Sequence, residues 1–116
     1  MAAGHTVGVC LHNHNLILRR QEKSKYMSAQ GIANAIVSRV GTTSYSSWRI
    51  GLTHDLAERK KHWGGTQKEN ITCWTAWEAD SLSDAQRVEA HFINKGMNGG
   101  TGGDLSARKT VYVYIF

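Results

Sequence analysis

The chain has 116 residues, no proline and a formal net charge of +5. This length suits one domain with a modest core, and the apolar content with four tryptophans excludes a disordered chain. No stretch is apolar enough to span a membrane and no signal-peptide pattern is present, so we expect a cytoplasmic protein with no membrane partner. The positive charge is a modest indication of an anionic partner such as DNA or RNA.

Residues 1–25 predict a β-hairpin followed by a basic segment. Its basic cluster includes Arg19 and Arg20, and is either a solvated surface or a set of phosphate contacts. His12 and His14 could share a strand face, but no third metal ligand lies near them in the sequence, so two turn histidines are expected.

The two cysteines, Cys10 and Cys73, stand in unrelated sequence contexts. They form neither a disulfide framework nor a zinc-ligand spacing. Two reduced, buried thiols are therefore expected.

Helices are predicted near residues 28–40, 55–63 and 83–95. Ser28 is the expected N-cap of the first helix, Asp55 with Glu58 forms a capping box for the second, and Ser83 with Gln86 forms one for the third. Each helix carries apolar residues at helical spacing on one side, which indicates that it covers a sheet.

Strands are predicted near residues 47–53, 71–79 and 110–116, where apolar residues alternate or β-branched and aromatic residues gather. Loops are expected at 64–70 and, rich in glycine, at 97–103. Together these elements predict a single α+β domain, with a small mixed or antiparallel sheet flanked by about three helices.

Two charged residues, Arg59 and Glu89, lie on the apolar sides of their predicted helices. Burying a charge costs several kcal/mol unless it is paired or used. One interpretation is a structural ion pair, or side chains that reach the edge of the apolar face. The other is a site where the arginine stabilises a phosphate and the glutamate binds a divalent metal.

The run Ile50-Gly51-Leu52-Thr53, followed by Asp55-Leu56, Arg59 and His62, resembles the second half of the GIY-YIG nuclease signature. In that family an Ile-Gly strand end leads into a helix that carries the catalytic arginine. Glu89, within residues 84–93, is similar to the family's metal-binding glutamate on a later helix. The resemblance covers roughly residues 47–96.

This sequence departs from the family at three places. The helix histidine, His62, lies one residue nearer to the arginine than in many members. Arg49 stands where the second motif has a tyrosine, and no strand of the first motif precedes residue 48 at the usual short distance. The C-terminal run Val111-Tyr112-Val113-Tyr114-Ile115 looks like that missing strand. We therefore predict a permuted GIY-YIG-like core over residues 47–116, with Tyr112 as the counterpart of the first motif's tyrosine and Tyr114 as the other candidate.

The resemblance implies a metal-dependent endonuclease that hydrolyses phosphodiester bonds with Mg²⁺ or Mn²⁺. Arg59 would stabilise the scissile phosphate, Glu89 would hold the metal, Tyr112 or Tyr114 would help to deprotonate water, and His62 is a candidate for proton transfer. The expected nucleic-acid contacts come from basic residues, namely Arg49, Lys60, Lys61, Arg19 and Arg20. DNA is the expected partner, while RNA and a homo-oligomer stay open.

Two alternatives to the endonuclease involve no catalysis. The first is a non-catalytic module that binds nucleic acid or protein on the same scaffold, which Arg49 in place of a tyrosine favours. The second is a structural interaction protein with no nucleic-acid role, which the moderate charge allows.

Overall fold

The computed structural model describes residues 26–99 and 105–116. The predicted hairpin and basic segment at residues 1–25, including Arg19 and Arg20, lie outside the described residues. So does most of the predicted glycine loop, at residues 100–104.

The described residues form an α+β fold with a mixed four-stranded sheet. Its helices are α2 (Ala29–Val40), α3 (Leu56–Lys61) and α4 (Leu82–Asn94), with short helical segments η1 (Tyr45–Ser47) and η2 (His62–Thr66). Its strands are β1 (Arg49–Thr53), β2 (Thr75–Glu78), β3 (Asn98–Gly99) and β4 (Tyr112–Ile115). The predicted α+β class, with a small mixed sheet and about three helices, is confirmed.

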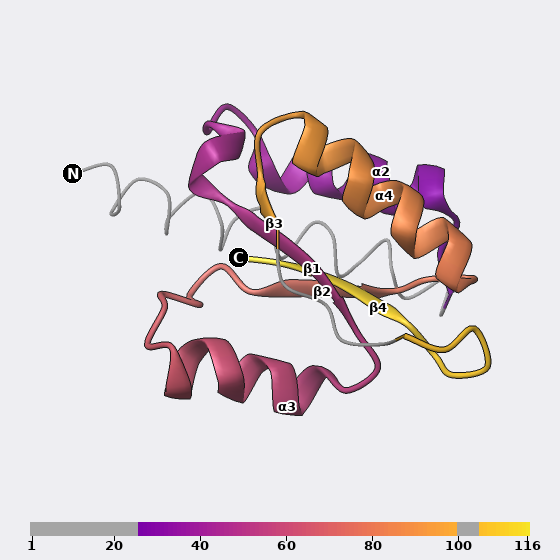
Figure 1. Ribbon diagram of the computed structural model, residues 1–116. Helices are drawn as coiled ribbons and strands as arrows, with labels where there is room; N and C mark the ends of the chain where they lie inside the picture. Colours follow the sequence, from indigo (N-terminus) through magenta and orange to yellow (C-terminus); the bar gives the residue numbers. More distant parts are fainter. Residues whose placement is uncertain (1–25, 100–104) are drawn as a thin grey trace.

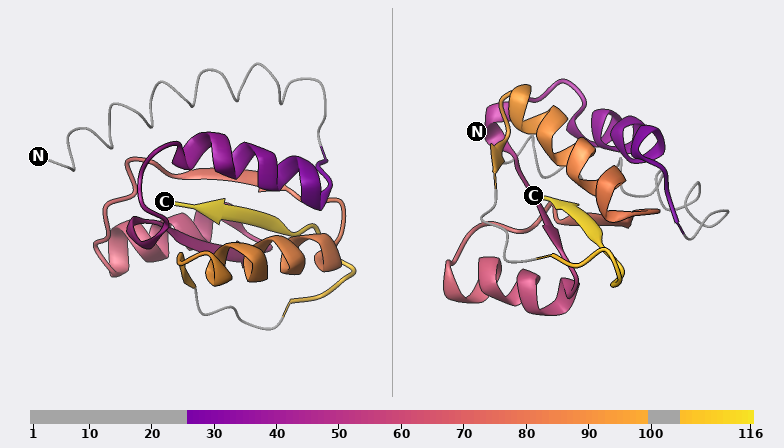
Figure 2. Two further views of the ribbon diagram at one scale, coloured as in Figure 1. Left: turned by 90° about the horizontal axis from the view of Figure 1, so that it is seen from above. Right: turned by 45° about the vertical axis from the view of Figure 1, so that its right-hand side comes forward.

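The C-terminal strand β4 lies in the middle of the sheet, whose order is β2-β4-β1-β3. It pairs antiparallel with β1, where Tyr114 faces Gly51, and antiparallel with β2, where Tyr114 faces Ala76. The short β3 pairs in parallel with Arg49 and Ile50. Helices α2 and α4 cover one side of the sheet and α3 lies on the other (Figures 1 and 2).

The two faces of β4 separate two apolar clusters. Because successive strand side chains point to opposite faces, Val111, Val113 and Ile115 enter the main core beneath α2 and α4. Tyr114 and Phe116 instead join Trp63 in a smaller aromatic cluster on the α3 side, which Leu56, Ile71, Trp74 and Ala76 complete. Helix α3 lies on the same side of the sheet as this second cluster, and we call this side the α3 face.

Two of the three predicted helix N-caps are confirmed and the third is wrong. Ser28 accepts a hydrogen bond from the Gly31 amide, and Asp55 accepts one from Glu58, as caps should. The cap of α4, however, is Ser81, which accepts from the Asp84 amide at 3.0 Å. The prediction of Ser83 was wrong because Ser81 begins a competing capping pattern two residues earlier.

Two predicted boundaries also change. The strand expected over residues 71–79 is ladder-paired only from Thr75, because Asn70 accepts hydrogen bonds from both the amide and the hydroxyl of Thr72 and turns the chain. The helix expected to end at Trp63 continues into η2, a π-helical turn that occupies part of the predicted 64–70 loop.

Cys73 is buried but is not a free thiol: it is disulfide-bonded. The expected reduced state is therefore wrong for this residue, because the pairing of cysteines that are distant in the chain cannot be read from their spacing. Cys10 lies outside the described residues. Among the described helices, none combines the length and apolar character needed to cross a membrane.

Candidate active site on the α3 face

Tyr114 is the centre of the candidate site. It lies on the central strand, is 1% exposed, and its hydroxyl oxygen accepts a hydrogen bond from Trp63 Nε1 at 2.9 Å. The phenol crosses β1 directly over Gly51, where any added Cβ would clash with the hydroxyl. A glycine at position 51 is therefore required by the close approach of this ring.

Three charged residues from separate elements act on the Tyr114 phenol. Burial is the main cause that raises the pKa of Tyr114, and the negative charge of Glu89 adds to the rise. The hydrogen bond from Trp63 and the positive charges of Arg59 and Arg49 lower this pKa in part. At neutral pH the phenol is therefore protonated, and it lies within electrostatic range of all three charges.

Arg59 is half-buried on α3, the helix that Asp55 caps. Its Nε is buried and has no hydrogen-bond partner among the described residues. A buried donor without a partner costs about 1–3 kcal/mol. Since arginine N–H groups are suited to anionic oxygens, the half-buried Arg59 side chain is a candidate partner for a phosphate or carboxylate.

Glu89 lies on α4, which is on the opposite side of the sheet from α3 (Figure 1), and its charge contributes to the raised pKa of Tyr114. The residue is half-buried, and burial raises the pKa of its carboxyl group. A divalent cation bound to this carboxyl group would stabilise its ionised form, which burial disfavours.

Glu89 would be a sparse metal site by itself. No group of three or more His, Cys, Asp or Glu side chains in the described ranges is placed to hold a metal. Mg²⁺ is commonly held by one or two carboxylates while water and substrate phosphate complete its shell. The donor set therefore fits Mg²⁺ or Mn²⁺ that arrives with a phosphate substrate, and does not resemble an enclosed structural metal site.

The remaining predicted residues lie around this centre. Arg49 is half-buried, donates from Nη1 to the Gly99 carbonyl at 2.8 Å, and places its guanidinium carbon 4.6 Å from the centroid of the Trp63 ring. His62 is half-buried in η2, edge-on to Trp63 at 5.0 Å. Lys60 and Lys61 are exposed at the end of α3.

Tyr112 is placed differently from Tyr114. It is half-buried, lies two residues before Tyr114 on β4, and pairs with Thr53 on β1 and Glu78 on β2. The charges of Arg59, Glu89 and Arg49 influence the pKa of Tyr114, the second of the two candidate tyrosines.

Two further residues belong to the site. Trp63 is buried, and its indole N–H donates a hydrogen bond to the Tyr114 hydroxyl. Its spacing of four residues after Arg59 indicated a shared helix face. Trp74 stacks on Tyr114 with ring centroids 4.7 Å apart, and no signal in the sequence separates it from the other tryptophans.

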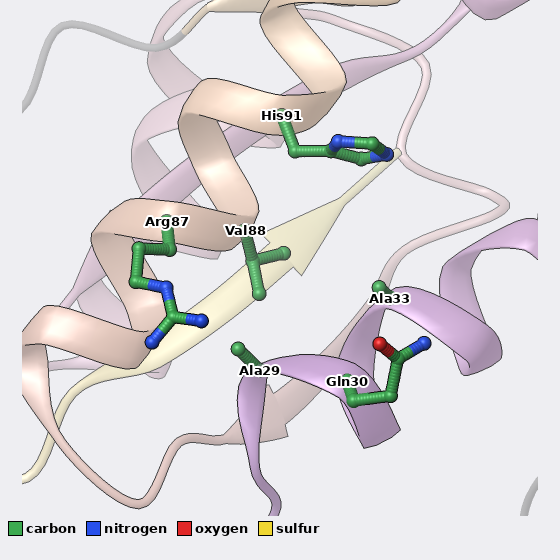
Figure 3. A pocket seen from close by; sticks show the side chains of 6 residues that line it. All are labelled: Ala29, Gln30, Ala33, Arg87, Val88 and His91. Carbon is green, nitrogen blue, oxygen red and sulfur yellow. The ribbon is translucent and has the colours of Figure 1, made fainter.

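A separate hollow of about 320 Å³ lies between α2 and α4. Figure 3 shows Ala29, Ala33 and Val88 beside it, with the polar side chains of Gln30, Arg87 and His91 around them. It contains none of the predicted site residues and belongs to the helices that cover the opposite side of the sheet from α3 (Figure 1).

Comparison with protein-family models, curated proteins and solved structures found no significant match to this chain.

Proposed function

We propose that this chain is a metal-dependent nuclease domain that hydrolyses phosphodiester bonds in nucleic acid. The observation that carries the proposal is the buried phenol of Tyr114, which is held by Trp63 Nε1 and whose pKa is influenced by the charges of Arg59, Glu89 and Arg49. An arginine, a carboxylate and a hydroxyl around one point can bind a phosphate, hold a divalent cation and orient water.

Arg59 would contact the scissile phosphate. Its side chain is only half-buried, and arginine N–H groups are suited to bind phosphate oxygens. The same contact would stabilise the negative charge that grows on the phosphate during the reaction.

Glu89 would hold Mg²⁺ or Mn²⁺. When bound, the ion supplies positive charge to the phosphate oxygens. The bound ion would also offset the cost of keeping the Glu89 carboxylate ionised in its desolvated position.

Tyr114 would orient the attacking water. Its oxygen already accepts from Trp63 Nε1, and its raised pKa keeps the phenol protonated at neutral pH. Its own O–H is then a donor, so it fixes the position of a water molecule or phosphate oxygen. His62, half-buried beside Trp63, is the candidate to accept the proton from water.

A nuclease assay tests this proposal. Plasmid and single-stranded DNA are incubated with Mg²⁺, Mn²⁺ or EDTA, using the parent chain, Arg59→Ala and Glu89→Ala. We expect metal-dependent cleavage that falls at least about 100-fold in both variants, the scale typical of losing one charge-stabilising group. Matched controls are Arg87→Ala, whose side chain is 73% exposed, and Glu69→Ala in an exposed loop.

One observation favours the non-catalytic module as the second candidate. Arg49 donates a hydrogen bond to the Gly99 carbonyl and lies over the Trp63 ring. It occupies the position where the resembled family has a tyrosine. Salt-sensitive binding without cleavage in any metal would support this module and reject the nuclease. Cleavage that Arg59→Ala and Glu89→Ala leave unchanged would also reject the proposed site.

A further inference from the structure

Trp74 differs from the other tryptophans in its exposure. Trp48, Trp63 and Trp77 are 3%, 7% and 3% exposed, as expected for core residues. Trp74 is only half-buried although it lies against the candidate site. An indole that is partly open beside a charged site is suited to contact with a planar ligand.

The ring of Trp74 is held in a fixed orientation. It lies nearly parallel to Tyr114, with an interplanar angle of 10° and a centroid distance of 4.7 Å. Phe116 is also nearly parallel to it, at 21° and 5.6 Å. Because the small Ala76 lies opposite Tyr114 on β2, Trp74 can extend across the neighbouring strand. The indole is therefore preorganised, and little side-chain conformational entropy is lost when a ligand stacks on it.

A positively charged side chain lies next to the same aromatic cluster. Phe116 contacts Trp63 at 5.4 Å, and the guanidinium of Arg49 lies over the Trp63 ring. The buried rings of Tyr114, Phe116 and Trp63 thus connect the half-buried Trp74 to Arg49. Aromatic rings beside cations are the combination that binds single-stranded nucleic acid, because the rings stack bases and the cations contact phosphates.

We propose that Trp74 stacks an unpaired nucleobase next to the phosphate that Arg59 contacts. The substrate class is then a single strand, or a duplex with an unpaired nucleotide at the site, because a base inside a duplex is already stacked on its neighbours. This inference rests on the proposed function for the position of the phosphate. The stacking itself is tested without any hydrolysis.

The first experiment measures binding in EDTA by fluorescence anisotropy. The probes are short single-stranded DNA, single-stranded RNA, duplex DNA, and the same DNA strand with abasic positions. The parent should bind the single strand at least about tenfold more tightly than the abasic strand, and Trp74→Ala should remove this difference. The DNA and RNA arms identify the natural sugar, and duplex should bind more weakly than either single strand.

Two control variants separate stacking from folding. Trp74→Phe keeps an aromatic ring and should retain most of the preference for bases. Trp77→Phe changes a tryptophan that is 3% exposed in the main core, so it should leave that preference unchanged. The salt dependence of binding should be the same in the parent and Trp74→Ala, because phosphate contacts are unaltered.

A second experiment uses the parent chain and needs no variant to fold. Single-stranded DNA that contains 5-iodouracil is photo-crosslinked to the protein, which is then reduced and digested with trypsin. Cleavage after Lys68 and Arg87 releases Trp74 on peptide 69–87, whereas Trp63 is on peptide 62–68. Fragment spectra should place the crosslink on Trp74.

The outcomes separate this inference from the proposed function. Metal-dependent cleavage with equal affinity for normal and abasic strands would overturn the stacking role and leave the nuclease in place. Base-dependent binding that Trp74→Ala abolishes, without cleavage, would support stacking and reject the nuclease. A crosslink found only on residues other than Trp74 would overturn the inference.

Discussion

Gly51 and Tyr114 show how a single residue pair shapes the candidate site. The Tyr114 ring lies across β1 because position 51 has no Cβ, and this places the hydroxyl against Trp63 Nε1. The same arrangement removes the phenol from water, which raises the pKa of Tyr114. Glycine at position 51 thus allows Tyr114 to be a buried, protonated phenol whose oxygen accepts a hydrogen bond from Trp63 Nε1.

Gly51→Ala should therefore destabilise the fold. The added methyl group would clash with the Tyr114 hydroxyl, and overpacking of this kind costs about 1–3 kcal/mol. Chemical denaturation of both proteins measures the loss. The matched control is Gly65→Ala, where the nearest atom to an added Cβ is Lys61 Cγ at 3.8 Å, an ordinary contact. Equal stability of Gly51→Ala and the parent would contradict the described packing.

The Glu89 carboxyl gives a pH-dependent prediction. Burial raises its pKa in the folded chain above the unfolded value. Its favourable contribution is therefore complete below the unfolded pKa and is lost as the pH rises through the folded pKa. Glu89→Gln, which does not ionise, should gain stability relative to the parent as the pH rises from acid to neutral.

Thermal unfolding across this pH range measures the difference between Glu89→Gln and the parent. Added Mg²⁺ should raise the Tm of the parent at neutral pH but not that of Glu89→Gln, because only the parent has the carboxylate ligand. Glu69→Gln, in an exposed loop, is the control and should follow the parent. A stability difference that does not change with pH would contradict the burial of Glu89.

At the scale of elements, short capping contacts decide where the site-bearing helices begin. Asp55 starts α3 immediately after β1, so that Arg59 comes one turn later on the half-buried side. Ser81 starts α4, which turns Ala85, Val88 and Phe92 toward the core and leaves Glu89 half-buried. Each cap satisfies an amide that the first helical turn leaves without a partner.

The two serines near the start of α4 provide a matched pair of variants. Ser81→Ala removes the acceptor for the Asp84 amide and should cost about 1 kcal/mol of stability. Ser83→Ala lies within the first turn, is exposed, and should change stability by less than about 0.5 kcal/mol. Urea denaturation measures both variants. A larger loss for Ser83→Ala would contradict the assignment of the cap to Ser81.

For the described part of the molecule, the main feature is that its last strand lies in the middle of the sheet. β4 supplies hydrogen bonds to β1 and β2, core side chains to the α2 and α4 side, and Tyr114 to the α3 side. The candidate site therefore combines residues 49–63, 89 and 114, which are distant in sequence. Bringing them together requires closing long loops, which favours slower folding.

A chain that ends at Thr110 should lose cooperative folding. It lacks Val113 and Ile115, which are fully buried, and leaves β1 and β2 without the strand between them. Circular dichroism with thermal melting should show no sharp transition. Lys109→Ala in the full chain is exposed just before the strand and should melt as the parent does. A cooperative transition in the shortened chain would show that β4 is dispensable.

By itself, the sequence determined the α+β class, the positions of three helices and the alternation of the terminal strand, because caps and apolar periodicity are local properties. It also identified Arg59 and Glu89 as charges on apolar faces. Only the tertiary structure decided that β4 pairs between β1 and β2, that Tyr114 is buried on the α3 side of the sheet, and that Trp63 and Trp74 contact it. These relations join residues far apart in the chain, and strand pairing and side-chain stacking across a sheet leave no periodic signal in the sequence.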